Sequence, residues 1–298
     1  MVNIDHKPAV EAVKVQPAAK QRSLSSSVRF IVLLLTAIIV LLPAYVLIVT
    51  SFKAPGDATA ANAWSLPANW VLDNWRNAWF GSDRIPAQAP GVLRSMTLVI
   101  PAALISAFLG SMNGYVFAKV RFPYSNLVFT FILFGMFIPY QAVMIPLVQL
   151  MNEVPLPSGI PQLIFIHVVF GIPISTLIFR NYYTSIPQEL IEAARVDGGG
   201  LFRIYWSVVL PNSVPGFVVV LIWQFTSVWN DFLFAVFFSN AQNGPVTITL
   251  NNLAQGSILQ DYGASMAGAL IASLPTLVVY ILLGRYFISG LMAGSVKG

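Results

Sequence analysis

The chain has 298 residues but no cysteine and few charged side chains. The absence of cysteine excludes disulfide bonds and thiolate metal sites. Charged residues make up only 9% of the sequence and hydrophobic residues 57%, whereas about a quarter of a soluble domain is charged. This composition indicates an integral membrane protein, and so apolar a chain calls for no nucleic-acid partner.

The sequence also lacks a phosphate-binding loop of the form G-x-x-x-x-G-K-[ST], which cradles the phosphates of ATP with its backbone and its lysine. The run Gly198-Gly199-Gly200 has neither that lysine nor a preceding strand. We therefore expect no catalytic residue, no metal site and no cofactor in this chain.

Long apolar stretches, by contrast, are abundant. A membrane-spanning helix needs about 20 mostly apolar residues, and the sequence predicts an all-α membrane protein with six such helices. We place these spans at 30–51, 92–117, 126–149, 160–180, 213–238 and 265–288. Within the second span, small residues recur at every fourth position, from Ala102 to Gly114, and this spacing lets another helix approach closely.

Lysine and arginine are concentrated in alternate loops, which the positive-inside rule places in the cytoplasm. The segments 1–29, 118–125 and 180–212 all carry them, whereas 150–160 and 239–262 have none. Both termini are therefore expected in the cytoplasm. We divide the chain into a flexible cytoplasmic tail, 1–29, and a transmembrane domain, 30–298.

A polar, glycine-containing segment separates the fourth and fifth spans and so lies on the cytoplasmic side. Ser185 and Gln188 have the spacing of a capping box, and Pro187 suits a first helical turn. These residues predict a short helix that ends near Asp197. The glycines at 198–200 then break it, because only glycine enters left-handed conformations without strain.

A second short helix should follow at 201–210 and end before Pro211. Its bulky residues recur at helical spacing and are expected on one face; they are Phe202, Tyr205, Trp206 and Val209. Such a face either fills the cleft of a partner protein or packs on the helix ends of the chain itself.

The same segment carries a specific pattern: Glu192-Ala193-Ala194, then Gly198 after three residues, then the ending Val208-Val209-Leu210-Pro211. This pattern resembles the EAA loop of ATP-binding-cassette (ABC) importer permeases, although Val208 stands where isoleucine is common. Further features resemble the carbohydrate-importer branch, and in particular the shorter six-span permease of maltose-type importers. They are Asp197, the triplet Trp229-Asn230-Asp231 and the chain ending Gly290 to Gly298.

The resemblance implies a subunit that forms half of a sugar translocation path in the inner membrane of a prokaryote. Its partners would be a second permease, two ATPase subunits that hold ATP and Mg, and an extracytoplasmic sugar-binding protein. The segment 185–211 would be a two-helix coupling loop seated in the ATPase, in which Glu192 pairs with a basic residue and Gly198 forms the elbow. The coupling residues so implied are Glu192, Ala193, Ala194, Asp197, Gly198, Phe202, Tyr205, Trp206, Leu210 and Pro211.

Polar side chains inside the spans are candidates for the substrate path, because such groups are costly in hydrocarbon and tend to face a cavity. Asp231 either accepts sugar hydroxyl groups or caps and bridges helices. His167 is either a ligand or an interhelical hydrogen-bonding residue, and the aromatic rings either stack on a sugar or pack between helices. The candidates are Tyr140, Gln141, His167, Trp229, Asn230 and Asp231, and Asn113 and Gln224 are further polar groups within the spans.

Two external segments are candidates for contact with the binding protein. One is the tryptophan-rich stretch 52–91, and the other is 244–262 with its polar residues Asn251, Asn252 and Gln255. Each is alternatively an amphipathic segment on the bilayer surface. For the whole chain, the alternatives are a permease for a polyol, a glycoside or another solute, a stand-alone secondary transporter, and a membrane scaffold. A secondary transporter would be expected to have ion-coupling carboxylates in its spans or broken-helix repeats. Asp231 is the only residue that fits the first expectation, and the sequence shows no repeat.

Overall fold

The computed structural model describes residues 26–83, 85–257 and 262–293, and the regular elements in these ranges are helices. The chain divides into two compact units, of which the first ends at Ala44 and the second begins at Tyr45. Most of the tail 1–29 and the chain end from 294 onward lie outside the described residues.

Five helices in the described ranges are long and apolar enough to cross a membrane. The first is α1, Ser26–Ser51, which runs from the first unit into the second. The others are α3 (Ala89–Lys119), α6 (Ile160–Thr184), α9 (Val214–Trp229) and α12 (Gly263–Ala293). These helices confirm the predicted first, second, fourth and sixth spans, and they confirm the fifth as far as Trp229.

The predicted third span, 126–149, is not a single straight helix. It consists of α4 (Ser125–Phe134), the 3₁₀ turn η1 (Gly135–Phe137) and α5 (Tyr140–Glu153), and the two parts are bent by 97°. Pro139 explains the break, because a proline disfavours helical backbone at the residue before it. Ile138 is accordingly extended, with a φ of −74° and a ψ of 120°.

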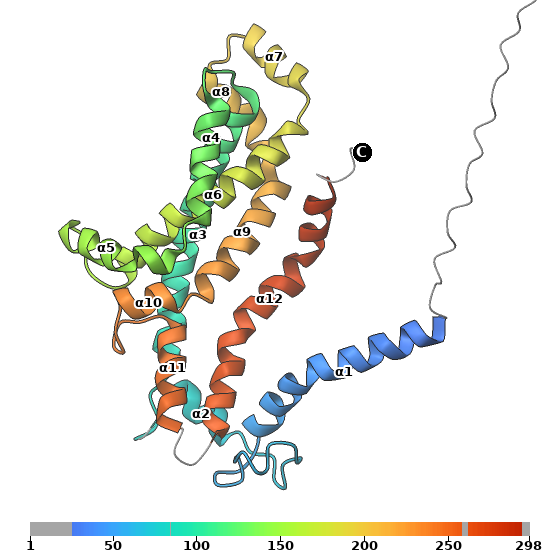
Figure 1. Cartoon of the computed structure of the whole chain (residues 1–298), viewed down its shortest axis with the longest axis vertical. Coiled ribbons are helices and arrows are strands. Elements are labelled where there is room, and N and C mark those ends of the chain that lie inside the picture. Colours follow the sequence, from blue (N-terminus) through green and yellow to red (C-terminus); the bar gives the residue numbers. More distant parts are fainter. Residues whose placement is uncertain (1–25, 84, 258–261, 294–298) are drawn as a thin grey trace, which may run out of the picture. The chain divides into compact units, whose positions relative to one another are not determined.

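The predicted fifth span is also too long at its far end. Helix α9 stops at Trp229, and the separate short helix α10 (Leu233–Phe238) begins after the irregular residues 230–232. At this break the Asp231 carboxylate accepts hydrogen bonds from the backbone N–H groups of Phe234 and Ala235, as a capping side chain does at the start of a helix. In Figure 1, α10 lies beside α5, which it contacts.

The predicted external segment 244–262 is largely a helix, α11 (Val246–Ser257). Its Val246 and Leu253 are buried, and α11 packs on α3 and α12. A second short helix, α2 (Asp73–Phe80), lies in the tryptophan-rich stretch and contacts α12. Figure 1 shows α2 at one end of the second unit, with α7 (Gln188–Val196) at the opposite end.

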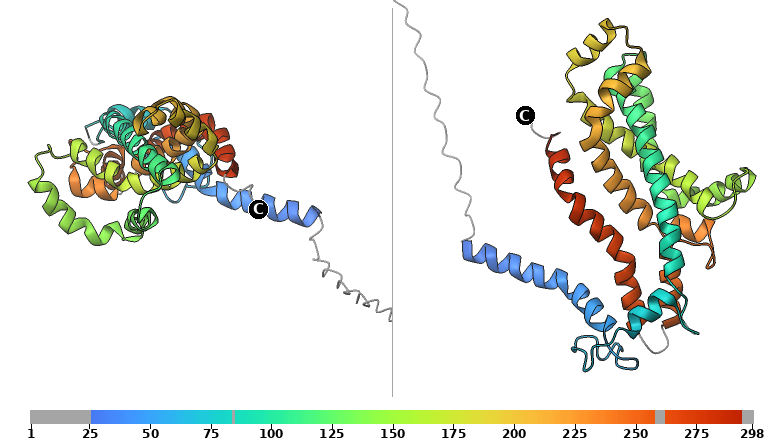
Figure 2. Two further views of the ribbon diagram at one scale, coloured as in Figure 1. Left: turned by 90° about the horizontal axis from the view of Figure 1, so that it is seen from above. Right: turned by 180° about the vertical axis from the view of Figure 1, so that it is seen from behind.

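Helices α3 and α6 of the second unit pack closely against each other. A side-chain carbon added at Gly110 would lie 2.3 Å from Ser175 Cβ, and one added at Gly114 would lie 2.6 Å from Phe179 Cβ. The small residues of the second span therefore bring α3 against another helix of the same chain. Helix α9 packs on this pair and on α12, and the right-hand view of Figure 2 shows it between α3 and α12.

Candidate functional site

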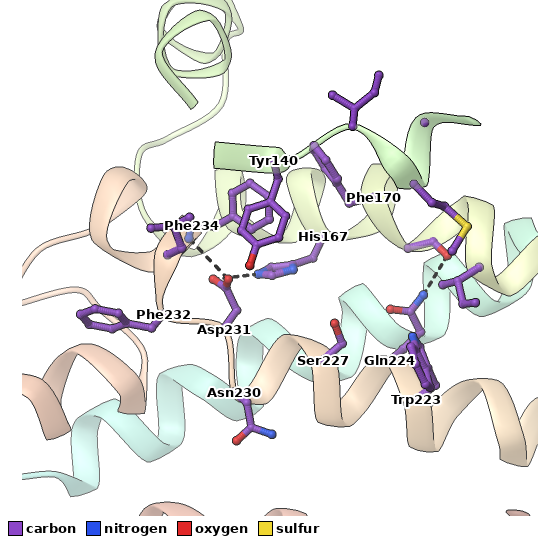
Figure 3. A pocket seen from close by; sticks show the side chains of 16 residues that line it. Tyr140, His167, Phe170, Trp223, Gln224, Ser227, Asn230, Asp231, Phe232 and Phe234 are labelled. Atoms are coloured by element: carbon purple, nitrogen blue, oxygen red, sulfur yellow. Dashed lines mark hydrogen bonds and ion pairs between the residues drawn. The ribbon is translucent and has the colours of Figure 1, made fainter. Parts of the chain in front are cut away.

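A cavity of 640 Å³ opens where the third and fifth spans are both interrupted. Figure 3 shows the side chains around it, which come from η1 and the start of α5, from α6, from α9, and from residues 230–234 at the break between α9 and α10. Its labelled lining residues are Tyr140, His167, Phe170, Trp223, Gln224, Ser227, Asn230, Asp231, Phe232 and Phe234. Broken helices supply such a site because their irregular backbone is tolerated at membrane depth only where it is buried in protein or lines a cavity.

Asp231 and His167 face each other on one side of this cavity (Figure 3). The Asp231 Oδ2 atom lies 3.6 Å from His167 Nε2, too far for a hydrogen bond, so the contact is an ion pair only when the imidazole is protonated. The same carboxylate caps α10 through the N–H groups of Phe234, at 3.4 Å, and Ala235, at 3.2 Å. Asp231 therefore serves a structural role and still presents oxygen atoms to the cavity.

Aromatic rings form the wall next to this pair. Phe234 is 5% exposed, and its ring centroid lies 5.5 Å from that of Tyr140 and 5.2 Å from that of Phe170. His167 meets the edge of the same ring at an interplanar angle of 86°. The half-exposed faces of Tyr140 and Phe170 are thus held in place by a buried ring behind them.

The opposite side of the cavity is polar and belongs to α9 and α6. Gln224 is buried, and its Nε2 atom donates to the Gly171 carbonyl oxygen at 2.8 Å and to Ser175 Oγ at 2.9 Å. Both N–H groups of this amide are used to join α9 to α6. Ser227 on α9 and Asn230, the C-cap of that helix, are exposed. The Asn230 amide nitrogen donates to the Thr226 carbonyl oxygen at 2.9 Å, so Asn230 presents its amide oxygen to the cavity.

The structure brings together four of the six residues predicted for the path: Tyr140, His167, Asn230 and Asp231 line the cavity. Gln141 and Trp229 do not line it. Trp229 is 2% exposed, stacks on Phe225 and donates its indole N–H to the Ala272 carbonyl oxygen at 2.8 Å, which leaves no free ring face.

Sequence reasoning missed the lining residues Phe170, Trp223, Ser227, Phe232 and Phe234, and it noted Gln224 only as a polar group within a span. A signal existed for one group of them. Trp223, Ser227 and Asn230 are spaced by four and three residues, which places them on one face of a helix. No such spacing pointed to Phe232 and Phe234, because their positions depend on where the fifth span breaks and α10 begins.

The polar segment after α6 forms the glycine elbow that the sequence predicts. Helix α7 ends with Asp197 as its C-cap, and Gly198 follows with a φ of +79°. The Gly198 N–H donates to the Arg195 carbonyl oxygen at 3.0 Å and the Gly199 N–H donates to that of Ala194 at 2.9 Å. These are the two hydrogen bonds of a Schellman motif, which requires left-handed backbone at Gly198.

The predicted capping box at the start of α7 is wrong. The N-cap residue is Pro187, which has no side-chain hydrogen bond to give, and Ser185 Oγ donates backward to the Tyr182 carbonyl oxygen at 2.6 Å. Ser185 continues the last turn of α6 instead of starting the next helix, so its hydroxyl is already used.

The second helix of the loop also differs from its prediction. Residues Leu201–Ile204 form α8, but Tyr205–Val209 form a π-helical turn, η2, and a 3₁₀ turn, η3 (Pro211–Ser213), leads directly into α9. The bulky residues do not share one face. Tyr205 and Val209 are buried in their own chain, whereas Phe202 is 63% exposed and Trp206 54% exposed.

The other predicted coupling residues lie at or near the surface. Glu192, Ala193, Asp197, Gly198 and Pro211 are exposed, and Ala194 and Leu210 are half-buried. At the far end of the unit, Asn251 and Asn252 are half-buried on α11, and Gln255 is exposed. The C-terminal residues from 294 onward, which carried part of the family pattern, lie outside the described residues.

Comparison with known proteins places this arrangement in a family. Residues 107–291 match the family described as binding-protein-dependent transport system inner membrane component. A probable ABC transporter permease of Pyrococcus horikoshii is 46% identical over 62% of this chain and 68% of its own length. The melibiose/raffinose/stachyose import permease MelC of Bacillus subtilis is 30% identical over 90% of this chain and 96% of its own length.

The fold is similar to that in the crystal structure of a bacterial ABC transporter involved in the import of the acidic polysaccharide alginate. The TM-score is 0.72 at 20% identity, and the match covers 90% of this chain and all of the other. The family match covers more than half of the sequence, including the elbow, the cavity helices α6 and α9, and most of α12. This chain therefore belongs to the binding-protein-dependent transport system inner membrane components, the non-catalytic permease subunits of ABC importers.

Proposed function

We propose that this chain is the membrane subunit of an importer for neutral sugars and forms half of the translocation path. The observation that carries the proposal is the cavity at the two helix breaks, where rings and hydrogen-bonding groups converge. Sugar sites in proteins combine aromatic faces, which cover the apolar side of the ring, with a few placed polar groups for the hydroxyls. Tyr140 and Phe170 supply the first kind of group, and Asp231, Ser227 and Asn230 the second.

The charge of the cavity supports a substrate without an ionised group. Among the described residues, no lysine or arginine lines it, and its only carboxylate belongs to Asp231. On this chain's side of the path, an acidic sugar would meet the Asp231 carboxylate and no guanidinium or ammonium group, which is unfavourable at low dielectric. The names of the MelC sugars are consistent with a neutral substrate.

We assign the coupling role to the loop 185–211, with both termini and this loop in the cytoplasm of a prokaryotic cell. Exposed Glu192 on α7 and the exposed rings of Phe202 and Trp206 on the following turns form a surface suited to an ATPase subunit, because exposed aromatic side chains supply much of the energy at interfaces. ATP and Mg then belong to two ATPase subunits. A second permease completes the path, and a sugar-binding protein delivers substrate at the side of Asn251, Asn252 and Gln255.

The test uses the whole complex in proteoliposomes: this chain, the second permease, the ATPase subunits and the cognate binding protein. Neutral sugars, among them raffinose and melibiose, are compared with galacturonate for stimulation of ATP hydrolysis and for uptake. The variant Glu192→Gln removes one charge from α7, and Glu189→Gln on the same exposed helix is the matched control with an equal change in net charge.

A charge-assisted hydrogen bond is worth about 1.5–3 kcal/mol, so Glu192→Gln should lower sugar-stimulated ATP hydrolysis by about tenfold or more. The Glu189→Gln complex should stay close to the wild type. Equal activity of both variants would refute the coupling assignment. Uptake of galacturonate in preference to every neutral sugar would refute the substrate class.

A further inference from the structure

Four buried hydroxyl groups form a cluster where the coupling loop meets the membrane helices. Ser111 Oγ on α3 lies 2.5 Å from Tyr183 Oη on α6 and 2.9 Å from Tyr205 Oη on η2. Tyr183 Oη lies 2.9 Å from Ser213 Oγ on η3, which itself donates to the Val209 carbonyl oxygen. All four side chains are at most 1% exposed. Three hydrogen bonds thus connect four separate elements through one point.

The π-helical turn explains how the loop reaches this cluster. In η2 the Leu210 N–H donates to the Tyr205 carbonyl oxygen at 2.8 Å, five residues back. A π turn widens the helix by one residue and is often found at functional positions. Here Tyr205, Val209 and Ser213 are buried, while Trp206 remains exposed beside them.

The protonation state of Tyr205 suits a hydrogen-bonded role. Burial raises the pKa of its phenol above the ordinary value of 10.0, and the hydrogen bond with Ser111 offsets part of that rise. The hydroxyl therefore keeps its proton at neutral pH and can donate to Ser111.

The other side of the cluster is rigid. Added carbon atoms at Gly110 and Gly114 would collide with α6, so α3 and α6 are packed backbone to backbone at the level of Ser111. At the end of α3, the buried Lys119 donates a hydrogen bond from its ammonium group to the carbonyl oxygen of Ile186, at a distance of 2.6 Å. Ile186 lies just before α7. The coupling loop is thus attached to the α3–α6 pair at its beginning and near its end.

We propose that the Ser111–Tyr183–Tyr205–Ser213 cluster is the joint that passes movement of the coupling loop to α3, α6 and α9, with Tyr183 and Tyr205 as positioning residues. The inference rests on the proposed coupling function of the loop. Without the hydroxyl groups, the rings would still fill the core, but η2 could slide against α3. ATP hydrolysis would then continue with less substrate moved for each ATP.

The variants Tyr183→Phe and Tyr205→Phe test the proposal because each removes one hydroxyl and keeps the ring. Tyr115→Phe is the matched control: Tyr115 is a buried tyrosine on α3, its ring lies 5.7 Å from that of Tyr205, and its hydroxyl has no hydrogen-bond partner among the described residues. The measured quantity is the ratio of sugar taken up to ATP hydrolysed in the reconstituted complex. The sugar is raffinose, or the neutral sugar that stimulates ATP hydrolysis by the wild type most. Thermal melting of each complex is recorded alongside.

Loss of one buried hydrogen bond is worth about 1 kcal/mol, so the ratio should fall by roughly three- to tenfold in Tyr183→Phe and Tyr205→Phe and stay unchanged in Tyr115→Phe. A lower melting temperature with an unchanged ratio in both test variants would show a merely structural cluster and overturn the proposal. An equal fall of the ratio in Tyr115→Phe would overturn it as well. A wild-type complex without sugar-stimulated ATP hydrolysis would instead contradict the proposed function, so the two failures are distinguishable.

Discussion

Replacement of Gly198 by alanine should weaken coupling without disturbing the rest of the molecule. Gly198 has a φ of +79°, and a carbon added there would meet no atom within 4 Å among the described residues. The cost of the substitution is therefore conformational and not steric. A left-handed backbone costs an alanine about 1–2 kcal/mol relative to glycine.

This cost changes the local equilibrium between the formed and the open elbow. The Schellman hydrogen bonds of Gly198 and Gly199 to Arg195 and Ala194 hold the elbow between α7 and α8. A penalty of about 1–2 kcal/mol lowers the ratio of the formed to the open elbow by roughly five- to thirtyfold. The helices of the membrane domain do not depend on this residue, so the melting temperature should hardly change.

Gly200 provides the matched control. It is also exposed and also has no atom within 4 Å of an added carbon among the described residues, but its φ is −75°, which suits any residue. It is the N-cap of α8, where alanine is less favourable than glycine, and this loss is offset by the lower entropy of the unfolded alanine chain. Gly200→Ala should therefore be close to neutral.

The assay is sugar-stimulated ATP hydrolysis and uptake by the reconstituted complex, measured for Gly198→Ala and Gly200→Ala in parallel. We expect at least a fivefold loss in the first variant and less than a twofold change in the second, by the conversion of about 1.4 kcal/mol to a factor of ten. Equal behaviour of the two variants would refute the reasoning, because the sign of φ is the difference from which the larger cost at Gly198 is derived.

Two further predictions concern the cavity and the helix pair. Asp231→Asn keeps one oxygen to cap α10, so it should lower sugar-stimulated ATP hydrolysis and leave the melting temperature nearly unchanged. Asp231→Ala should in addition lower the free energy of unfolding by about 1 kcal/mol, because the cap is lost. Wild-type activity in both variants would argue against a substrate role for Asp231. Gly114→Ala should lower the free energy of unfolding in detergent by about 1–3 kcal/mol, because the added carbon would lie 2.6 Å from Phe179 Cβ and overpacking carries this cost. Gly284→Ala on α12 is the control for that measurement, since its added carbon meets no atom within 4 Å among the described residues, and equal melting of the two variants would contradict the close packing.

The loop 185–211 was more predictable than the lining of the cavity. Its signals are local: three consecutive glycines, a short polar stretch and the Glu192-to-Pro211 pattern all lie within one segment. Its side-chain directions were not predictable, because a π turn shifts Tyr205 and Val209 into the core. Regular helical spacing placed these two residues with Phe202 and Trp206, and one extra residue in the turn was enough to separate them.

The lining of the cavity depends on contacts between distant segments. Asp231 stood out in the sequence as a carboxylate within an apolar span, but its meeting with His167 joins positions 64 residues apart. Phe234 lines the cavity only because α9 ends at Trp229 and α10 turns toward α5. Hydropathy averages over such a break, since the residues on both sides of it are equally apolar, and so it predicted one continuous span.

The sequence by itself determined the membrane class, the positions of five spans, the elbow at Gly198 and the family, because each rests on composition or on residues close together in the chain. Only the tertiary structure decided that the third span is bent by 97°, that the cavity lies at this bend, and that four hydroxyl groups join the loop to α3 and α6. The physical reason is that hydrophobic length selects a helix for the membrane whatever its partner. Close packing and buried hydrogen bonds, in contrast, select particular partners, and those are known only once the helices are together.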